Sequence, residues 1–231
     1  MPYFYGIDSL YIILVLPAIL LSLFAQMKVS STFGKYNSVR NHRNITGFDV
    51  ARRILDRNGL NYIPIERTRG NLTDHYDPKK KVLRLSDSVF SSTSIAALGV
   101  AAHECGHAIQ HAYGYTPLKI RHAVFPVVRI SSTLAVPLII LGFVLATTNL
   151  VYVGIVLFAA VVLFQLITLP VEFDASRRAL AILSCENYLY EDEMKGARKV
   201  LSAAALTYVA SALTSLMQLL RFIIIANNRR R

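Results

Sequence analysis

Long apolar runs constrain this chain most, because about 18 or more consecutive apolar residues can cross a hydrocarbon core of roughly 30 Å. The first run is the uncharged stretch SLYIILVLPAILLSLFAQ at residues 9–26. No Lys or Arg precedes it, so we interpret it as an uncleaved anchor with its N-terminus outside rather than a signal peptide. Two runs at about 130–147 and 150–169 are joined by TTN, which predicts an antiparallel membrane hairpin. A fourth run, 201–226, is interrupted only by Arg221.

The composition favours a membrane protein over a nucleic-acid-binding protein. Of the 231 residues 54% are hydrophobic, the mean hydropathy is +0.43 and the formal net charge is +11. A nucleic-acid-binding protein seldom carries long uncharged apolar runs, whereas a membrane protein needs Lys and Arg on its cytoplasmic loops. We therefore expect a lipid bilayer as partner and no nucleic acid. Cys105 and Cys185 follow no disulfide spacing pattern, which fits a reducing compartment.

The basic residues near the ends of the runs indicate the orientation. Lys28, Lys119 and Lys195, with their basic neighbours, fall on one side if the first three runs cross the membrane. The positive-inside rule makes that side cytoplasmic. The C-terminal arginines, residues 229–231, disagree, because a full fourth span would place them outside. Whether residues 201–226 span the membrane or lie against it therefore stays open at this point.

Between the apolar runs the chain is polar enough to form a folded unit outside the bilayer. NITGFDVARRILDRNGL predicts a helix with Thr46 as N-cap and Asp49 as the acidic partner of a capping box. Residues 62–68 and 81–87 predict short strands, and residues between them have turn chemistry. The second strand is either an exposed edge that binds an extended peptide or an ordinary internal strand. A long helix is predicted to open at residues 91–94 and to stop at Gly114.

These features predict an order of five segments along the chain. They are an N-terminal transmembrane anchor (1–26), a soluble subdomain that holds the long helix (27–122), a transmembrane helical hairpin (123–170), a further helix (171–200), and a C-terminal apolar helix with a basic tail (201–231).

The sequence VAAHECGHAIQHA, residues 100–112, carries the clearest chemical signal. On a helix His103 and His107 lie on one face about one turn apart, so both imidazoles can reach one tetrahedral zinc at roughly 2.0–2.1 Å. Glu104 leans toward the same space, where it can hold the zinc-bound water and take its proton. The alternative is a buried helix with hydrogen-bonded histidines. That alternative is costly for two imidazoles and a carboxylate among alanines, so we predict one zinc ion (Zn2+) per chain.

A catalytic zinc also needs a third protein ligand and an open position. Glu172, in LPVEFDASRRAL, is the best candidate because it follows the predicted hairpin, on the side that holds the HExxH helix. Its alternative role is a carboxylate stabilised by a helix dipole. Asp174 is two residues further and faces elsewhere on a helix. His111 lies two turns from His103, so we expect it at the rim or supporting other side chains, and Cys105 is expected to serve helix packing.

Four segments together resemble a known family: NLTDHYDPKKKVLRLS, AAHECGHAIQHA, PVEFDASRRAL and GARKVLSAAALTYVA. They resemble the YugP-type neutral zinc metallopeptidases of bacteria and, more distantly, the HtpX-like membrane metalloproteases. The resemblance implies His103, His107 and Glu172 as zinc ligands and Glu104 as base. The distant family has an Asp where this chain has Ser176, and that Asp supports a ligand. Either Asp174 or the Ser176 hydroxyl is expected to replace it here.

The expected protein is thus a mainly α membrane protein, with transmembrane helices and an inserted α+β zincin-like metalloprotease domain made of the HExxH helix and a small sheet. The resemblance implies a multi-pass bacterial cell membrane endopeptidase whose active site faces the cytoplasm and whose substrates are membrane or membrane-associated proteins. Four residues are candidates for stabilising the oxyanion: His75, Tyr76, His122 and Arg177.

Two other classes of protein remain as alternatives. A non-proteolytic zinc-stabilised scaffold or chaperone-like protein would need four protein ligands on its zinc. A transporter or channel would need charged residues within its spans, where only Arg129 and Arg221 qualify, both near span ends. The sequence leaves a homo-oligomer or a membrane partner open.

Overall fold

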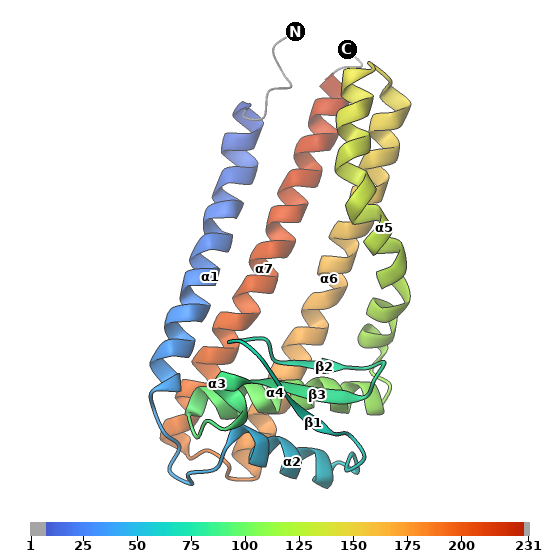
Figure 1. Ribbon diagram of the computed structural model, residues 1–231. Coiled ribbons are helices and arrows are strands. Elements are labelled where there is room, and N and C mark those ends of the chain that lie inside the picture. Colours follow the sequence, from blue (N-terminus) through green and yellow to red (C-terminus); the bar gives the residue numbers. More distant parts are fainter. Residues whose placement is uncertain (1–7, 229–231) are drawn as a thin grey trace. The chain divides into compact units, whose positions relative to one another are not determined.

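The computed structural model describes residues 8–228, so the C-terminal arginines, residues 229–231, lie outside the described part (Figure 1). The chain forms two compact units. Unit 1 comprises Met1–Gln26, Lys119–Leu169 and Leu206–Arg231. Unit 2 comprises Met27–Leu118 and Pro170–Ala205.

Unit 1 is built from parts of long apolar helices. The π-helix η1 (Tyr11–Val15) leads into α1 (Leu16–Asn37), and α5 (Thr116–Val144), α6 (Thr148–Cys185) and α7 (Glu191–Asn228) follow later in the chain. Among the described residues, four helices are long and apolar enough to cross a membrane, and the helix that holds residues 201–226 is one of them. Length and composition therefore place the fourth run with the other three.

The helices α5 and α6 pack against each other as an antiparallel pair. A Cβ built on Gly142 would lie 2.7 Å from the Val151 backbone nitrogen, and one on Gly154 would lie 2.8 Å from the Ala135 carbonyl oxygen. From the first approach to the second, the residue number falls from 142 to 135 along α5 and rises from 151 to 154 along α6, as an antiparallel pair requires. Small residues at such crossings let helices pack closely where lipid provides no hydrophobic driving force.

Within unit 1, polar contacts join the N-terminal helix to α7. The Ser22 hydroxyl lies 3.0 Å from the Thr214 hydroxyl, which also donates to the Ala18 carbonyl at 3.1 Å. Farther along α7, Arg221 binds Asp8 through two hydrogen bonds, at 3.1 and 3.3 Å. A cation in an apolar helix is costly unless it is paired. The Asp8 carboxylate therefore explains how α7 tolerates Arg221.

Unit 2 holds the sheet and the shorter helices. The helix α2 (Gly47–Arg57) begins at Thr46, and the predicted capping box with Asp49 is confirmed. Strands β1 (Ile65–Thr68), β2 (His75–Asp77) and β3 (Val82–Ser86) form a sheet in the order β1-β3-β2, with β1–β3 parallel and β2–β3 antiparallel. A short helix, α3 (Asp87–Phe90), precedes α4 (Ile95–Ala112), which Ser94 caps by accepting from the Ala97 amide at 3.0 Å.

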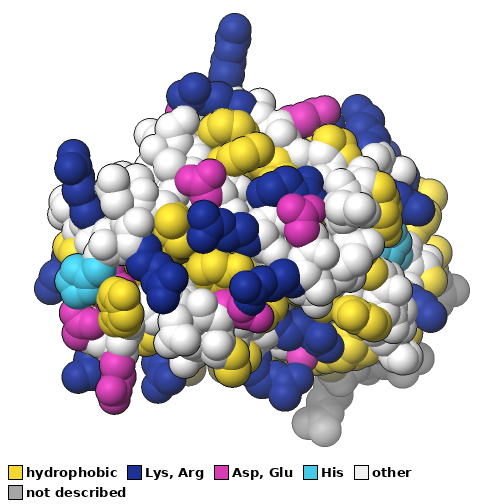
Figure 2. Space-filling view, turned by 90° about the horizontal axis from the view of Figure 1, so that it is seen from below, with side chains coloured by type: hydrophobic (Ala, Val, Ile, Leu, Met, Phe, Trp, Pro, Cys, Tyr) yellow, Lys and Arg dark blue, Asp and Glu magenta, His cyan; other side chains and the backbone are white. Residues whose placement is uncertain are grey.

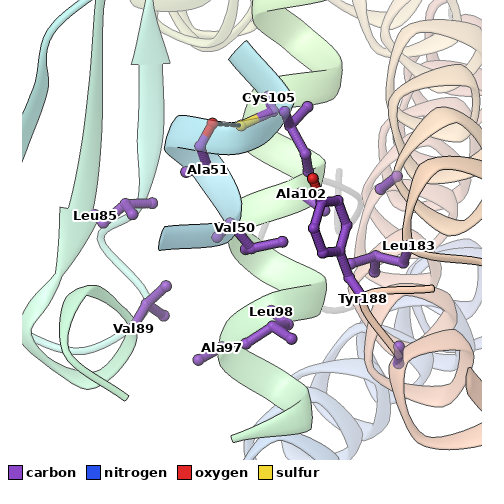
Figure 3. Close-up of a cluster of buried hydrophobic side chains, with 14 of the residues drawn as sticks. Val50, Ala51, Leu85, Val89, Ala97, Leu98, Ala102, Cys105, Leu183 and Tyr188 are labelled. Atoms are coloured by element: carbon purple, nitrogen blue, oxygen red, sulfur yellow. Dashed lines mark hydrogen bonds between the residues drawn. The ribbon is translucent and has the colours of Figure 1, made fainter. Parts of the chain in front are cut away.

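The core of unit 2 lies around α4. Figure 3 shows Val50 and Ala51 of α2, Leu85 of β3 and Leu183 of α6 directed toward the α4 side chains. The Cys105 thiol contacts the Ala51 carbonyl at 3.6 Å, and burial raises its pKa. Cys105 thus serves helix packing, as expected.

Two predictions about the sheet need correction. The two predicted strands are present with shorter bounds, but β2 is missed, because its three residues lie in a segment dense in turn-forming residues. Pairing with β3 overrides that local preference. The strand at 82–86 is also central in the sheet, so the alternative in which it forms an exposed edge is wrong. The edges are β1 and β2.

The helix after the hairpin also differs from the prediction. The sequence predicts a separate helix beginning at Val171, but α6 runs without a break from Thr148 through Pro170 to Cys185. Proline inside a helix costs about 3 kcal/mol because it lacks a backbone N–H. Val171, Ala175 and Leu183, spaced along one helix face, are fully buried. Their burial favours continuing the helix past the proline.

Ion pairs on the surface of unit 2 are numerous but contribute little to its stability. Examples are Arg52–Asp56 at 2.8 Å, Arg67–Asp87 at 2.6 Å and Arg84–Glu66 at 2.9 Å. Figure 2 shows Lys and Arg side chains spread among acidic and hydrophobic ones on the face seen from below. Exposed pairs contribute about 0–1 kcal/mol each, so the buried cluster around α4 is the main source of stability in this unit.

The Asp8–Arg221 pair leads to a prediction about stability. Arg221→Ala leaves Asp8 without its guanidinium in a pair whose side chains are only 12% and 17% exposed. We expect a loss of about 2 kcal/mol, below the ~3–5 kcal/mol of a fully buried pair. The apparent Tm in detergent should fall by about 4–8 °C.

The swap Asp8→Arg with Arg221→Asp should recover much of this loss. Lys199→Ala, an exposed cation on α7, is the control. If the fall in Tm of the double variant equals the sum of the falls in its two single variants, Asp8 and Arg221 do not form a pair.

Candidate metal centre

Two histidines of α4 and a glutamate of α6 come together in unit 2. His103 and His107 lie one helical turn apart, with ring centroids 4.7 Å from each other. Glu172 Oε2 lies 3.4 Å from His103 Nε2 and 3.5 Å from His107 Nε2. The three donor atoms lie within 4.8 Å of one another, and the glutamate is buried. The sequence had singled out the same three residues.

The spacing of these donors fits a tetrahedral metal ion. Two ligands bound to zinc at about 2.0–2.1 Å and at the tetrahedral angle lie about 3.3–3.4 Å apart. The measured separations of 3.4 and 3.5 Å match that value and exceed a normal N–H···O hydrogen bond of about 2.7–3.2 Å. Two imidazoles and a carboxylate also suit zinc chemically. The residues therefore fit a zinc ion that three protein ligands hold.

A close crossing of α4 and α6 brings Glu172 to the histidines. A Cβ built on Gly106 would lie 2.7 Å from the Ala175 carbonyl oxygen and 3.2 Å from its Cα. Real Cβ atoms do not approach backbone so closely, so this position requires glycine. Ala175 follows Glu172 by one helical turn, and the crossing therefore sets the distance of the carboxylate from α4.

Each histidine has its own partner on the other ring nitrogen. His103 Nδ1 lies 3.1 Å from the Ser176 hydroxyl, and His107 Nδ1 lies 3.1 Å from Gln110 Oε1. Gln110 in turn donates to Asp174 Oδ2 at 3.0 Å. The sequence had left Asp174 and Ser176 as alternatives for one supporting role. In the structure Ser176 lies beside His103, and Asp174 contacts Gln110, which lies beside His107.

Gln110 is the residue that sequence reasoning missed. Its spacing from the motif contained the signal, because it lies three residues after His107 and seven after His103, on the same helix face. Its side chain is fully buried.

The strand β2 holds the carboxylate of Glu104. The Tyr76 backbone N–H donates to Glu104 Oε2 at 3.0 Å, and Glu104 is 8% exposed. Two residues before Tyr76, Asp74 accepts from the Ser86 amide at 2.7 Å and hydroxyl at 2.8 Å. Burial raises the pKa of Asp74, the Ser86 bonds oppose that rise, and the charge of Glu104 adds to it.

Tyr76 and His111 form a second polar contact on this side of α4. The Tyr76 hydroxyl lies 2.9 Å from His111 Nδ1. Burial raises the pKa of Tyr76 to about 12, so the phenol keeps its proton. Burial and the charge of Lys81 lower the pKa of His111, so His111 is neutral at pH 7. His111 is not part of the three-donor cluster.

The charge balance around His107 differs from that around His111. Burial alone would lower the pKa of His107, but the Glu172 carboxylate and the Glu104 charge outweigh it and raise that pKa. Two carboxylates thus favour positive charge where the imidazoles converge.

The remaining candidates are not among the three clustered donors. His75 is exposed, with Nδ1 2.8 Å from the Thr73 carbonyl, and its side chain alternates with that of Tyr76 along β2. Arg177 pairs with Asp174 and is 78% exposed. His122 lies on α5, in unit 1.

Comparisons with known proteins identify a family whose description names zinc. Residues 11–227 match a family described as "Putative neutral zinc metallopeptidase". The chain is 52% identical over 221 residues to "Putative membrane protease YugP" of Bacillus subtilis (strain 168), covering 96% of this chain and 98% of that protein. No solved structure matches the chain.

The helix crossing predicts that substitution by alanine is disruptive at Gly106 of α4 and tolerated at Gly99 of the same helix. Gly106→Ala should force α4 and α6 apart at a cost of about 1–3 kcal/mol, and it should weaken zinc binding about tenfold or more, because Glu172 moves with α6. Gly99→Ala is the matched control, since its Cβ would lie 3.7 Å from the Ala197 Cβ, an ordinary contact. Thermal unfolding and zinc titration in detergent measure both effects. Equal affinities in the two variants would show that the crossing does not set the centre.

Proposed function

Because this chain belongs to the "Putative neutral zinc metallopeptidase" family, we propose that it is a zinc-dependent endopeptidase. In this proposal His103, His107 and Glu172 hold one zinc ion, and Glu104 is the catalytic base. The observation that carries the proposal is the cluster of two imidazoles and one carboxylate at the spacing of zinc ligands, with a further carboxylate beside His103 on the same helix.

The chain's own residues divide the work of hydrolysis. Zinc, when bound, supplies Lewis acidity that polarises a peptide carbonyl and makes water nucleophilic at neutral pH. Three protein ligands leave a position open for substrate. Glu104 takes the proton from the attacking water and later gives it to the leaving amine. The Tyr76 amide holds that carboxylate in place, at 3.0 Å.

We assign the stabilisation of the developing oxyanion to the pair of Tyr76 and His111. The Tyr76 backbone already touches Glu104, and its phenol stays protonated. A neutral hydroxyl or imidazole N–H is the kind of donor that oxyanion stabilisation needs. Arg177 is a weaker candidate because Asp174 engages it, and His75 because its ring bonds the Thr73 carbonyl.

The setting of this activity is a bacterial membrane. The four apolar helices and the membrane protease relative support membrane association. We further propose a multi-pass arrangement with the active site on the cytoplasmic side, supported by the basic residues near the apolar runs. Substrates are then peptide bonds of membrane or membrane-associated proteins.

A structural role for the zinc explains the residues less well. Structural zinc normally has four protein ligands and no adjacent base. The cluster offers three ligands, and Glu104 stands next to the first of them.

Metal content tests the ligand set. Purified protein should hold about one zinc per chain. His103→Ala, His107→Ala and Glu172→Ala should each lose most of it, because each removes a donor. His111→Ala should keep it. Zinc analysis by mass spectrometry after detergent purification checks this, and full zinc retention by the His107 variant would remove that ligand.

The base is tested separately from the metal. Glu104→Gln keeps the size of the side chain but cannot accept a proton, so peptidase activity should fall by at least about a hundredfold while zinc stays bound. The readout is cleavage of a fluorogenic peptide library, with chelator-treated wild type as the blank. Undiminished cleavage by the variant would contradict the assigned mechanism.

A further inference from the structure

Gln110 is a buried polar side chain with three polar partners beside the metal centre. It lies on α4 one turn after His107 and is fully buried. Its Oε1 lies 3.1 Å from His107 Nδ1. Its Nε2 donates to the Val171 carbonyl at 2.8 Å and to Asp174 Oδ2 at 3.0 Å. The amide thus contacts one proposed ligand directly and the chain neighbour of another.

The partners of this amide leave it one orientation. The Val171 carbonyl can only accept a hydrogen bond. The Asp174 carboxylate is ion-paired with Arg177 and with Arg178, the latter at 2.6 Å, so it also only accepts. Both hydrogens of the Gln110 NH2 group are therefore used on these two acceptors, and its oxygen must face His107.

That orientation fixes the tautomer of His107. An amide oxygen can only accept, so His107 Nδ1 must carry the hydrogen. The Nε2 lone pair then points to Glu172 and the proposed metal position. His103 lacks such a constraint, because the Ser176 hydroxyl beside its Nδ1 can either donate or accept.

We infer that Gln110 is a positioning residue, which holds His107 in the metal-binding tautomer and carries the influence of Asp174 to the zinc centre. The inference rests on the proposed function. In this inference Asp174 acts indirectly. Its two arginines keep its carboxylate ionised, so that the carboxylate can only accept a hydrogen bond, and this orients the Gln110 amide.

Removing the amide tests the inference. Gln110→Met has similar size but no hydrogen-bonding group, so zinc affinity should fall about 10- to 100-fold. Ser176→Ala should lower it less, because Ser176 does not dictate a tautomer. Zinc affinity of the full chain in detergent is measured by competition with a chromophoric chelator, and unfolding of the zinc-free variants shows whether each is folded.

Exchanging donor and acceptor separates positioning from packing. Gln110→Glu is nearly isosteric and keeps an acceptor for His107, but its other oxygen faces the Asp174 carboxylate, so it should bind zinc more weakly than the wild type. Adding Asp174→Asn supplies an amide donor to the introduced carboxylate, so the double variant should regain at least about threefold of the roughly 10- to 100-fold loss. A residue that only fills space would show no such recovery.

The outcomes distinguish this inference from the proposed function. Wild-type zinc affinity in folded Gln110→Met would overturn the inference and leave the zinc site intact. Loss in Gln110→Glu without recovery in the double variant would overturn the tautomer argument. Failure of the wild type to bind zinc would overturn the proposed function itself.

Discussion

The close backbone contact between Gly106 and Ala175 is the constraint on which the metal centre depends. The two histidines sit on one helix and need only its periodicity, but the carboxylate comes from a segment far along the chain. Only a residue without a Cβ lets the Ala175 carbonyl approach α4 so closely. With α6 held there, Glu172 reaches both Nε2 atoms, Ser176 reaches His103, and Asp174 reaches Gln110. One glycine thus aligns three residues of α6.

The same contact explains what the sequence could predict and what it could not. His103, Glu104 and His107 follow from helix periodicity alone, because their geometry is local. The proximity of Glu172 rested on a hairpin argument and a family resemblance. The spacing places Gln110 on the same helix face as the two histidines, but its role was missed because that role comes from partners on α6, which no local pattern shows. The strand β2 was missed for a similar reason, since His75–Asp77 reads as turn and becomes strand only by pairing with β3.

Pro170 shows that composition alone does not locate the end of a helix. The end of the apolar run and the shift to polar residues together predicted a new helix at Val171, yet α6 continues through Pro170. Burial of Val171, Ala175 and Leu183 depends on a core that α4 and α2 complete, and that burial outweighs a local penalty of about 3 kcal/mol. A continuous helix keeps Val171, Glu172 and Asp174 in fixed phase, so Gln110 can bond Val171 and Asp174 on either side of the proposed ligand.

The buried carboxylates around the centre favour the binding of a divalent cation. The Glu172 carboxylate is buried within 3.5 Å of two imidazoles, and the Glu104 carboxylate is buried and accepts a hydrogen bond from a backbone amide. Two carboxylates at such depth are expensive without a compensating charge. A zinc ion held by His103, His107 and Glu172 would balance both charges and would need the histidines to be neutral, as ligands must be. Asp174 does not disturb this balance, because Arg177 and Arg178 neutralise it. Its charge therefore acts on the centre through the oriented amide of Gln110 rather than by direct attraction to the metal.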